Sequence, residues 1–339
     1  MDLSIIIVNW KSVEFLKDCI ASILSTTHCL NYEIIVVDNA SQPLACQGLA
    51  VSNPHVKVVC SDRNIGFARA NNLGLEYANG ERILFLNPDT VVLGEAILEM
   101  VRTLDSSPEI GVVGCRLLNS DRSLQTTCVQ RFPTLTNQLL GVEWLQKRTP
   151  GLPIWGMRAL FAPKTSGPAE VDVVSGACLM ARRSALVEVS GFSTDYFMYA
   201  EEADLCYKMR RAGKKICYTG KAEIVHLGGQ STKEKGSSFS DVVMRESIFV
   251  LLRKFKGLPY ATAYRMIMFL SAAVRVMMLG VVLPVAATTD WPVRREDLVQ
   301  ALQKWTKIAS WSLALEPWVH DLGVAPTSSA APVPGHRAP

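Results

Sequence analysis

The sequence predicts an α/β protein with a mainly parallel sheet flanked by helices, followed by a helical appendage at the C-terminal end. Two observations in the 339 residues support this fold class. Over the first 120 residues or so, short β-branched runs alternate with amphipathic helical stretches, and the runs are apolar throughout, as in strands buried on both faces. Beyond residue 235 the strand pattern stops and long apolar helical stretches replace it.

Four strands and three helices are predicted in the first third of the chain. The strands are the apolar runs 3–8, 33–37, 56–60 and 82–86. Ser12 is in the position of an N-cap for the first helix, because apolar residues recur at helical spacing from Val13 to Leu24. The second and third helices cover residues 68–78 and 95–104.

The rest of the chain divides into a variable middle part and a helical end. Residues 119–168 read as long loops with short helices, the kind of surface on which substrate sites are often built. The predicted strands are 111–117, 171–181, 216–218 and 223–226, with a helix at 200–212. We therefore predict a domain over 1–235, a helical region over 236–322 and a disordered Pro/Ala/Ser-rich tail over 323–339.

Composition excludes several classes of protein. Hydrophobic residues make up 49% of the chain and charged residues 19%, which indicates a globular protein. The net charge of +4 comes without a long basic run, so no nucleic-acid partner is expected. Nine scattered cysteines without a C-x-x-C pair, and a start without a signal-peptide pattern, favour reduced thiols and a cytoplasmic location.

Polar residues follow the predicted strands, at the sheet edge where α/β proteins bind ligands. They include Asn9, Asp38, Asn64, Asn87 and Asp89, any one of which could also be a simple turn residue. No glycine-rich phosphate loop follows the first strand, which argues against nicotinamide dehydrogenases, P-loop NTPases and nucleotidyltransferases. A diphosphate bound here would need a divalent cation, and Asp89 is the best-placed carboxylate to hold it.

Seven segments in collinear order resemble the motifs of family-2 glycosyltransferases of the GT-A fold. They are SIIIVNW (4–10), IVVDNAS (35–41), NIGFARANN (64–72), LNPDT (86–90), VSGACLM (174–180), FMYAEEADL (197–205) and HLGGQS (226–231). The resemblance covers residues 2–235 and is strongest to bacterial rhamnosyltransferase-like members that build cell-surface polysaccharide. It implies inverting transfer of a sugar from a nucleotide-diphosphate donor to a hydroxyl of a saccharide or lipid-linked acceptor.

The resemblance also implies a cofactor and a donor. The usual Asp-x-Asp metal motif is Asn87-Pro88-Asp89 here, a variant common in the rhamnosyl-like branch. This variant favours dTDP-rhamnose as the donor, although the sequence does not fix the donor sugar or its nucleotide. Asp89 would hold Mn²⁺ or Mg²⁺ together with His226, while Asn87 could only hydrogen-bond to the donor. The other nucleotide-sugar contacts implied by the motifs are Asn9, Asp38, Arg69 and Asn71.

The catalytic base is expected in the segment Glu201-Glu202-Ala203-Asp204. The family normally has Glu-Asp-x-Asp, in which the aspartate of the Glu-Asp pair deprotonates the acceptor, so Glu202 is the expected base and Glu201 the alternative. This departure leaves two other interpretations open. The pair could belong to a merely charged helix face, or the chain could be a catalytically inactive nucleotide-sugar-binding protein that keeps the fold.

Residues 265–291 form an apolar run long enough to cross a bilayer, interrupted by Arg275 and Pro284. Cations flank the run, namely Arg253, Lys254, Lys256 and Arg265 before or at its start and Arg294 and Arg295 after it. Three interpretations remain open. The favoured one is a helix lying on the anionic inner face of the cell membrane with its cations at headgroup level. The others are a spanning helix and a helix buried against the catalytic domain or a homodimer partner.

Overall fold

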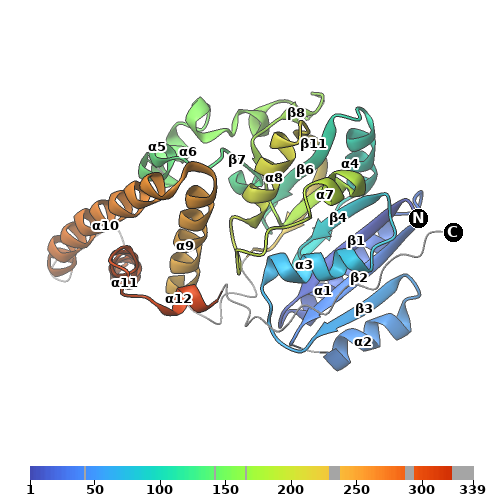
Figure 1. The fold of residues 1–339 in the computed structure, drawn as a ribbon, viewed down its shortest axis with the longest axis horizontal. Coiled ribbons are helices and arrows are strands. Elements are labelled where there is room, and N and C mark those ends of the chain that lie inside the picture. The colour runs from blue at the N-terminus through green and yellow to red at the C-terminus, as the bar shows by residue number, and fades with distance from the viewer. Residues whose placement is uncertain (42, 141–142, 165, 229–236, 287–293, 323–339) are drawn as a thin grey trace.

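The computed structural model describes residues 1–41, 43–140, 143–164, 166–228, 237–286 and 294–322. A twisted sheet with helices packed on it forms one part of the molecule, and the long helices α9, α10 and α11 stand beside it (Figure 1). The predicted domain boundary at 235 and the predicted tail 323–339 lie outside the described residues.

The central sheet has the strand order β3-β2-β1-β4-β10-β6-β11-β5, and β8 pairs with β11. Strands β1 to β4 are mutually parallel, as predicted, whereas β10 is antiparallel to both its neighbours and β5 is antiparallel to β11. A second, two-stranded sheet pairs β7 with β9. The strands are β1 Leu3–Asn9, β2 Tyr32–Asn39, β3 Val56–Ser61, β4 Arg82–Leu86, β5 Thr90–Val92, β6 Ile110–Leu118, β7 Val129–Gln130, β8 Ala169–Glu170, β9 Val173–Val174, β10 Cys178–Arg182 and β11 Lys215–His226.

The three helices predicted in the first third of the chain, and the one predicted near residue 200, are present within two residues of their expected ends. Ser12 precedes the first of them, but its hydroxyl donates to Asn9 Oδ1 (3.1 Å) and accepts no hydrogen bond from the N–H groups of the first helical turn. The α-helices of this part are α1 Val13–Thr26, α2 Pro43–Ser52, α3 Phe67–Glu76, α4 Ala96–Asp105, α5 Leu135–Leu140, α6 Glu143–Arg148, α7 Arg183–Glu188 and α8 Glu201–Arg211. Three short 3₁₀ turns are η1 Thr126–Cys128, η2 Pro153–Trp155 and η3 Arg158–Phe161.

Two strand predictions were wrong. The predicted strand 171–181 is two strands, β9 and β10, which belong to different sheets. A turn at Ser175 separates them, in which the backbone N–H of Ala177 donates to Ser175 Oγ (3.2 Å). The predicted strands 216–218 and 223–226 are instead one strand, β11. A register shift between Thr219 and Glu223 accommodates the residues that had suggested a break.

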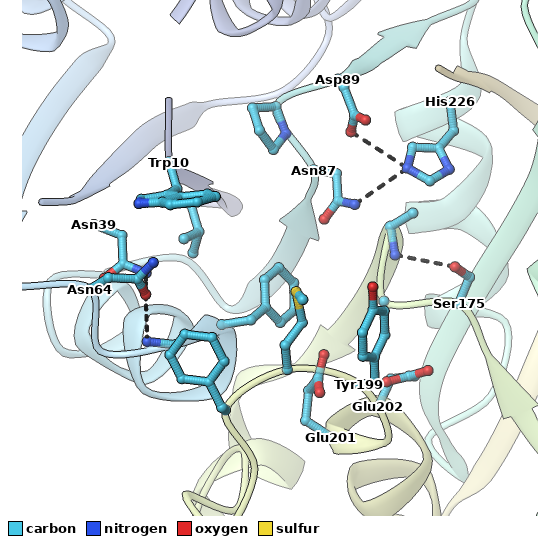
Figure 2. Close-up of a pocket in the computed structure, with 18 of the residues that line it drawn as sticks. Trp10, Asn39, Asn64, Asn87, Asp89, Ser175, Tyr199, Glu201, Glu202 and His226 are labelled. Atoms are coloured by element: carbon cyan, nitrogen blue, oxygen red, sulfur yellow. Dashed lines mark hydrogen bonds and ion pairs between the residues drawn. The ribbon is translucent and has the colours of Figure 1, made fainter. Parts of the chain in front are cut away.

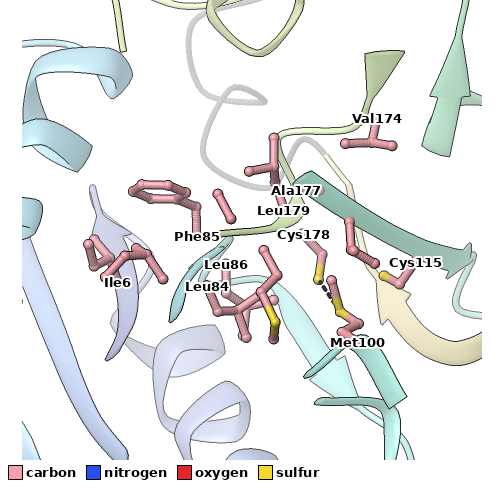
Figure 3. Packing of buried hydrophobic residues seen from close by; sticks show 14 of the residues in the cluster. Ile6, Leu84, Phe85, Leu86, Met100, Cys115, Val174, Ala177, Cys178 and Leu179 are labelled. Atoms are coloured by element: carbon pink, nitrogen blue, oxygen red, sulfur yellow. Dashed lines mark hydrogen bonds between the residues drawn. The ribbon is translucent and has the colours of Figure 1, made fainter. Parts of the chain in front are cut away.

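The core of the sheet holds the strand ends in place. Figure 3 shows Leu84, Phe85 and Leu86 of β4 packed among side chains from β1 and β10. All three are at most 2% exposed, so the backbone that leads into Asn87 and Asp89 has little freedom to move. Close packing below the edge of the sheet therefore fixes the polar residues that follow it.

The predicted helical appendage consists of α9 Ser237–Lys256, α10 Leu258–Ala286, α11 Arg295–Ser312 and α12 Trp318–Asp321. The appendage has its own apolar cluster, and the buried carboxylate of Glu246 lies beside it. Glu246 accepts a hydrogen bond from Trp311 Nε1 (2.7 Å) and lies 3.3 Å from Arg265. Lys254 ties the appendage to the sheet domain, because its ammonium donates to the fully buried Asp204 of α8 (2.8 Å).

The two arginines of the apolar run do not lie where the sequence suggested. Arg265 was expected at headgroup level, but it is paired with Glu246 and lies over the ring of Trp311. Arg275 was expected to interrupt the apolar surface, but it turns onto the ring of Trp305 in α11, 4.3 Å from its centroid, and donates to Ser271. Both cations therefore lie on the packed side of α10, where aromatic rings and a carboxylate compensate them.

Candidate active site

A cavity of about 300 Å³ lies at the carboxyl ends of the central strands (Figure 2). Its lining comes from strand ends, from the turn at Ser175, from the loop before α8, from α8 itself and from the first residues of α9. The side chains that carry chemistry are Trp10, Asn39, Asn64, Asn87, Asp89, Ser175, Tyr199, Glu201, Glu202 and His226. This is the edge at which the sequence predicts ligand binding.

Unusual backbone geometry surrounds this cavity. Lys11 and Ala40, which follow β1 and β2, have φ angles of 54° and 59°, and Tyr199 and Ala200 before α8 have 71° and 63°. Left-handed backbone is uncommon for residues other than glycine and is concentrated at functional sites. Gly66 also has a positive φ, and a Cβ there would lie 2.5 Å from the Phe197 carbonyl oxygen. These turns bring the loop before α8 against the start of α3.

One side of the cavity holds Asn87 and Asp89, both from the turn between β4 and β5, and His226 from the end of β11. The Nε2 atom of His226 lies 3.4 Å from Asp89 Oδ1 and 3.4 Å from Asn87 Nδ2. Asp89 is only 6% exposed, and Asn87 Oδ1 is buried without a hydrogen-bond partner. The sequence predicted this grouping, although 139 residues separate Asn87 from His226.

Gln125, which the sequence did not single out, sets the orientation of the His226 ring. Its amide nitrogen donates to the His226 backbone carbonyl (2.7 Å), so its Oε1 is the atom that faces His226 Nδ1 (3.0 Å). Oε1 can only accept, so Nδ1 is the donor in this contact, and Nε2 of a neutral ring then has a lone pair on the side of Asp89 and Asn87 Nδ2. A divalent cation could use this lone pair together with the Asp89 carboxylate.

Two adjacent carboxylates enter the cavity from the first turn of α8. Glu201 is 5% exposed and its Oε2 has no hydrogen-bond partner, whereas Glu202 is half-buried. Burial raises the pKa of Glu202, and burial together with the Glu202 charge raises the pKa of Glu201 well above its usual range. A carboxylate with a raised pKa in a cavity is suited to accept a proton from a substrate.

The opposite side of the cavity is neutral and polar. Asn39 donates through Nδ2 to Asn64 Oδ1 (3.0 Å), and the indole of Trp10 lies nearby (Figure 2). The predicted contacts Asn9 and Asp38 lie beneath this surface, both at 0% exposure, with Asn9 Nδ2 donating to Asp38 Oδ1 (3.0 Å). Strand alternation explains the difference, because Asp38 and Asn39 are neighbours on β2.

Two other predicted donor contacts do not line the cavity. Asn71 is 1% exposed and donates to the Phe67 carbonyl one turn earlier in α3 (3.0 Å). Arg69 is half-buried on the same helix and is absent from the cavity lining. The structure thus brings together Asn87, Asp89, Glu201, Glu202 and His226 of the predicted site residues, and it leaves Asn9, Asp38, Arg69 and Asn71 outside the lining.

An aromatic and sulfur-containing wall closes the cavity near the glutamates, and the sequence did not predict it. Phe197, Met198 and Tyr199 come from the loop before α8, and Phe239 comes from α9. The ring of Phe239 stacks on Trp318 of α12 at 5.3 Å between centroids. The helical appendage therefore contributes directly to the cavity, which periodicity in the sequence could not reveal.

The charge in the cavity has one sign. Three carboxylates line it, from Asp89, Glu201 and Glu202, and no Lys or Arg does so among the residues that the structure describes. Nor do the described residues contain a cluster of three side chains able to enclose a metal ion by themselves. An anionic ligand would need a cation beside it, held by Asp89 and His226 and completed by the ligand's own oxygens.

Comparison with known proteins identifies the family. Residues 4–190, more than half of the chain, match the model of the family described as glycosyl transferase family 2. The chain belongs to glycosyltransferase family 2. The predicted family is thereby confirmed, and five of the seven motifs lie within the matched residues. This family-2 glycosyltransferase is a transferase.

Relatives with known names are similar over most of their length. A low-salt glycan biosynthesis hexosyltransferase of Haloferax volcanii is 30% identical over 229 residues, covering 66% of this chain and 67% of its own. An N-acetylglucosaminyl-diphospho-decaprenol L-rhamnosyltransferase of Mycobacterium tuberculosis is 27% identical over 247 residues, covering 68% and 77%. The predicted similarity to rhamnosyltransferases is therefore confirmed.

A solved structure supports the fold. The family-2 glycosyltransferase superposes on a mannosyltransferase of Pyrobaculum calidifontis, solved with GDP-mannose and Mn²⁺, with a TM-score of 0.58 at 16% identity. The match covers 93% of this chain and 86% of that one. The predicted GT-A fold is confirmed.

The position of Gln125 allows a test of the candidate metal site by a residue that would not itself touch a cation held by Asp89 and His226. We expect Gln125→Ala to raise the Mn²⁺ concentration needed for half-maximal transfer by roughly 10–100-fold, because it releases the ring orientation of His226. The rate at saturating Mn²⁺ should fall much less. The matched control is Gln130→Ala, which removes an exposed amide on β7; an equal shift in both variants would contradict this role for Gln125.

Proposed function

We propose that this protein is an inverting, metal-dependent glycosyltransferase that moves rhamnose from dTDP-rhamnose to a hydroxyl of a saccharide or lipid-linked acceptor in cell-surface polysaccharide synthesis. The observation that carries the proposal is the division of one cavity into an Asp89–His226 pair and a Glu201–Glu202 pair, with no described cationic side chain in the lining. The first pair suits a cation–diphosphate, and the second suits an acceptor hydroxyl.

The donor's nucleotide would occupy the polar side of the cavity. Trp10 offers a ring face to a base, and the Asn39–Asn64 pair offers amide groups to a base or ribose. Asn9 and Asp38 would act indirectly, because their buried hydrogen bonds hold the end of β2 and Ser41, whose hydroxyl donates to Asp38 (2.7 Å). We propose no donor contact for Arg69 or Asn71.

The cation site would use Asp89 and His226. A carboxylate with an imidazole lone pair suits Mn²⁺, and the carboxylate with diphosphate oxygens suits Mg²⁺ as well. When bound, the cation would neutralise the charge that develops on the departing diphosphate. Asn87, with an unpartnered buried oxygen, would hydrogen-bond to the donor or to water on the cation.

The reaction would be a single displacement. Glu202 accepts the proton of the acceptor hydroxyl while the hydroxyl oxygen forms a bond to the anomeric carbon of the sugar. The bond between that carbon and the diphosphate oxygen breaks on the opposite face. Glu201, more deeply buried, would hold the acceptor or Glu202 in position. No covalent intermediate is required, so inversion follows from the geometry of the displacement.

The acceptor and the location follow from a relative's name and from the composition of this chain. The M. tuberculosis relative is named for a diphospho-decaprenol acceptor. We therefore propose a lipid-linked saccharide acceptor, met at the cytoplasmic face of the cell membrane. The exposed apolar helix α10, the described helix that is long and apolar enough to cross a bilayer, supports a membrane location.

A screen of nucleotide sugars tests this function. dTDP-rhamnose with Mn²⁺ should raise the temperature of thermal unfolding more than other nucleotide sugars, because a ligand bound to the folded state stabilises it by mass action. The same mixture with acceptor should release dTDP. Stabilisation without any release of nucleotide would favour the inactive binding protein, and stabilisation by a different nucleotide sugar would overturn the proposed donor.

A further inference from the structure

Helix α10 exposes a continuous apolar face. Its largest exposed side chains are all apolar, and Val281 reaches 70% exposure. At about 100° per residue they fall within an arc of roughly 120°, here called the apolar face. It consists of Met266, Leu270, Val274, Met277, Met278, Val281 and Val285.

The other side of α10 is fully used in packing. Ala261, Tyr264, Met268 and Ala272 are at most 1% exposed and belong to the apolar cluster of the appendage. Both arginines of the helix also lie on this side, against Glu246 and Trp305. A soluble monomer rarely presents so long an apolar surface, and α10 carries it without a charge.

Helix α10 and the end of α9 that leads into it carry positive charges and no acidic side chain. The sequence contains no Asp or Glu from residue 247 to residue 289. Arg253 and Lys256 are exposed at the corner between α9 and α10, where the apolar helix begins. Lys256 also lines a cavity of about 560 Å³ together with Arg131, Arg210, Arg211 and Asp172, whose carboxylate pairs with Arg131 and Arg210.

These features distinguish among three occupants of the apolar face. If α10 crossed a bilayer, Arg265, Arg275 and the packed side of the helix would lie in lipid, or α11 would have to separate from α10. A second copy docked by two-fold symmetry would bring α10 against α10, and this helix carries no carboxylate to pair with the cations of the other copy. An anionic lipid surface matches both the apolar face and the cations beside it.

We propose that the apolar face of α10 docks onto the surface of an anionic bilayer, with Arg253 and Lys256 beside it contacting lipid phosphates. Helix α5 packs against α10 and adds Leu139 and Leu140, both exposed, to the same region. Only the role of this docking, which is to hold the cavity near a lipid-linked acceptor, rests on the proposed function. The docking itself depends on α10 and its neighbours alone.

Sedimentation of the full-length protein with vesicles tests the proposal. At low salt the protein should pellet with phosphatidylglycerol-containing vesicles and not with pure phosphatidylcholine, and high salt should release it. The double variant Leu270→Asp/Val281→Asp should reduce the bound fraction at least tenfold. Arg253→Gln/Lys256→Gln should reduce binding severalfold and weaken its dependence on salt.

Controls separate docking from folding and from catalysis. Val187→Asp places the same charge at an apolar α7 position that is 68% exposed, and it should bind vesicles as the wild type does. Transfer to a water-soluble acceptor should be unchanged in all these variants. A wild-type protein that binds vesicles but transfers no sugar would refute the proposed function and leave the docking proposal intact. The proposal would be overturned by a wild type that stays in the supernatant at low salt, by an unaffected double Asp variant, by a dimer that the double Asp variant dissociates, or by extraction from membranes only with detergent.

Discussion

Asp89→Ala is expected to reduce sugar transfer by roughly 10²–10³-fold or more, the loss typical of removing one group that stabilises transition-state charge. Asp89 is a nearly buried carboxylate at the end of β4, beside the lone pair of His226 and in a cavity whose described lining offers no cationic side chain. Without it the departing diphosphate would lose its cation. Initial rates at increasing Mn²⁺ measure the effect.

Two further variants make the result specific. Asn87→Ala should cost less than Asp89→Ala, because it removes a neutral hydrogen-bonding group and leaves the charge. Asp18→Asn, on the exposed side of α1, should leave the rate unchanged. Activity above one tenth of wild type for Asp89→Ala at saturating Mn²⁺, in a variant that unfolds at the wild-type temperature, would show that the cation site is elsewhere.

Glu202→Gln is expected to lower kcat by roughly 10²–10⁴-fold with little change in KM, since a general base acts mainly in the transition state. Glu202→Asp should recover part of the activity, because the carboxylate remains and only its reach changes. Glu201→Gln should cost less than Glu202→Gln. A larger loss in Glu201→Gln would exchange the roles of the two residues.

The pH profile gives an independent test of the same base. Burial raises the pKa of Glu202 above 4.5, the ordinary value for glutamic acid, and the base is active only when deprotonated. Activity should therefore fall as the pH drops through this raised pKa, at a higher pH than an exposed glutamate would give. Because Glu201 and Glu202 interact, this fall in activity at low pH reflects the titration of both carboxylates. Its persistence in Glu202→Gln would mean that another group causes it.

The sequence predicted the parallel strands β1 to β4 and the position of Asn87 and Asp89 at the ligand edge of the sheet, for a physical reason. Buried parallel strands are continuous apolar runs, and the polar residue that ends such a run lies at the ligand edge of the sheet. Asp89 follows β4 in this way. His226 required a resemblance, because only tertiary structure brings the end of β11 next to it.

Other parts of the site could not be predicted from pattern alone. Nothing in the local sequence marks Gln125 as the partner of His226, since the contact spans 101 residues. Phe239 reaches the cavity through the packing of α9 beside the sheet domain. Asp38 and Asn39 differ in role through strand alternation, which indicates opposite faces without saying which face meets the ligand.

The inward turn of Arg275 shows a similar limit. In the sequence it interrupts an apolar run and weakens the case for a continuous apolar surface. In the structure it lies over Trp305, a residue 30 positions later on another helix, and the exposed side of α10 stays uncharged. Helical periodicity places Arg275 about 100–120° around α10 from Val274 and Val281, but it does not indicate that α11 supplies an aromatic ring to cover the charge.

The anomeric configuration of the product tests the central claim most directly. The protein, dTDP-rhamnose, Mn²⁺ and a saccharide acceptor would be incubated and the new glycosidic bond followed by NMR from the first turnovers. A single displacement assisted by Glu202 predicts a product whose configuration is opposite to that of the donor, formed at a rate that collapses in Asp89→Ala. A product with retained configuration, or transfer at an undiminished rate in Asp89→Ala, would contradict the account.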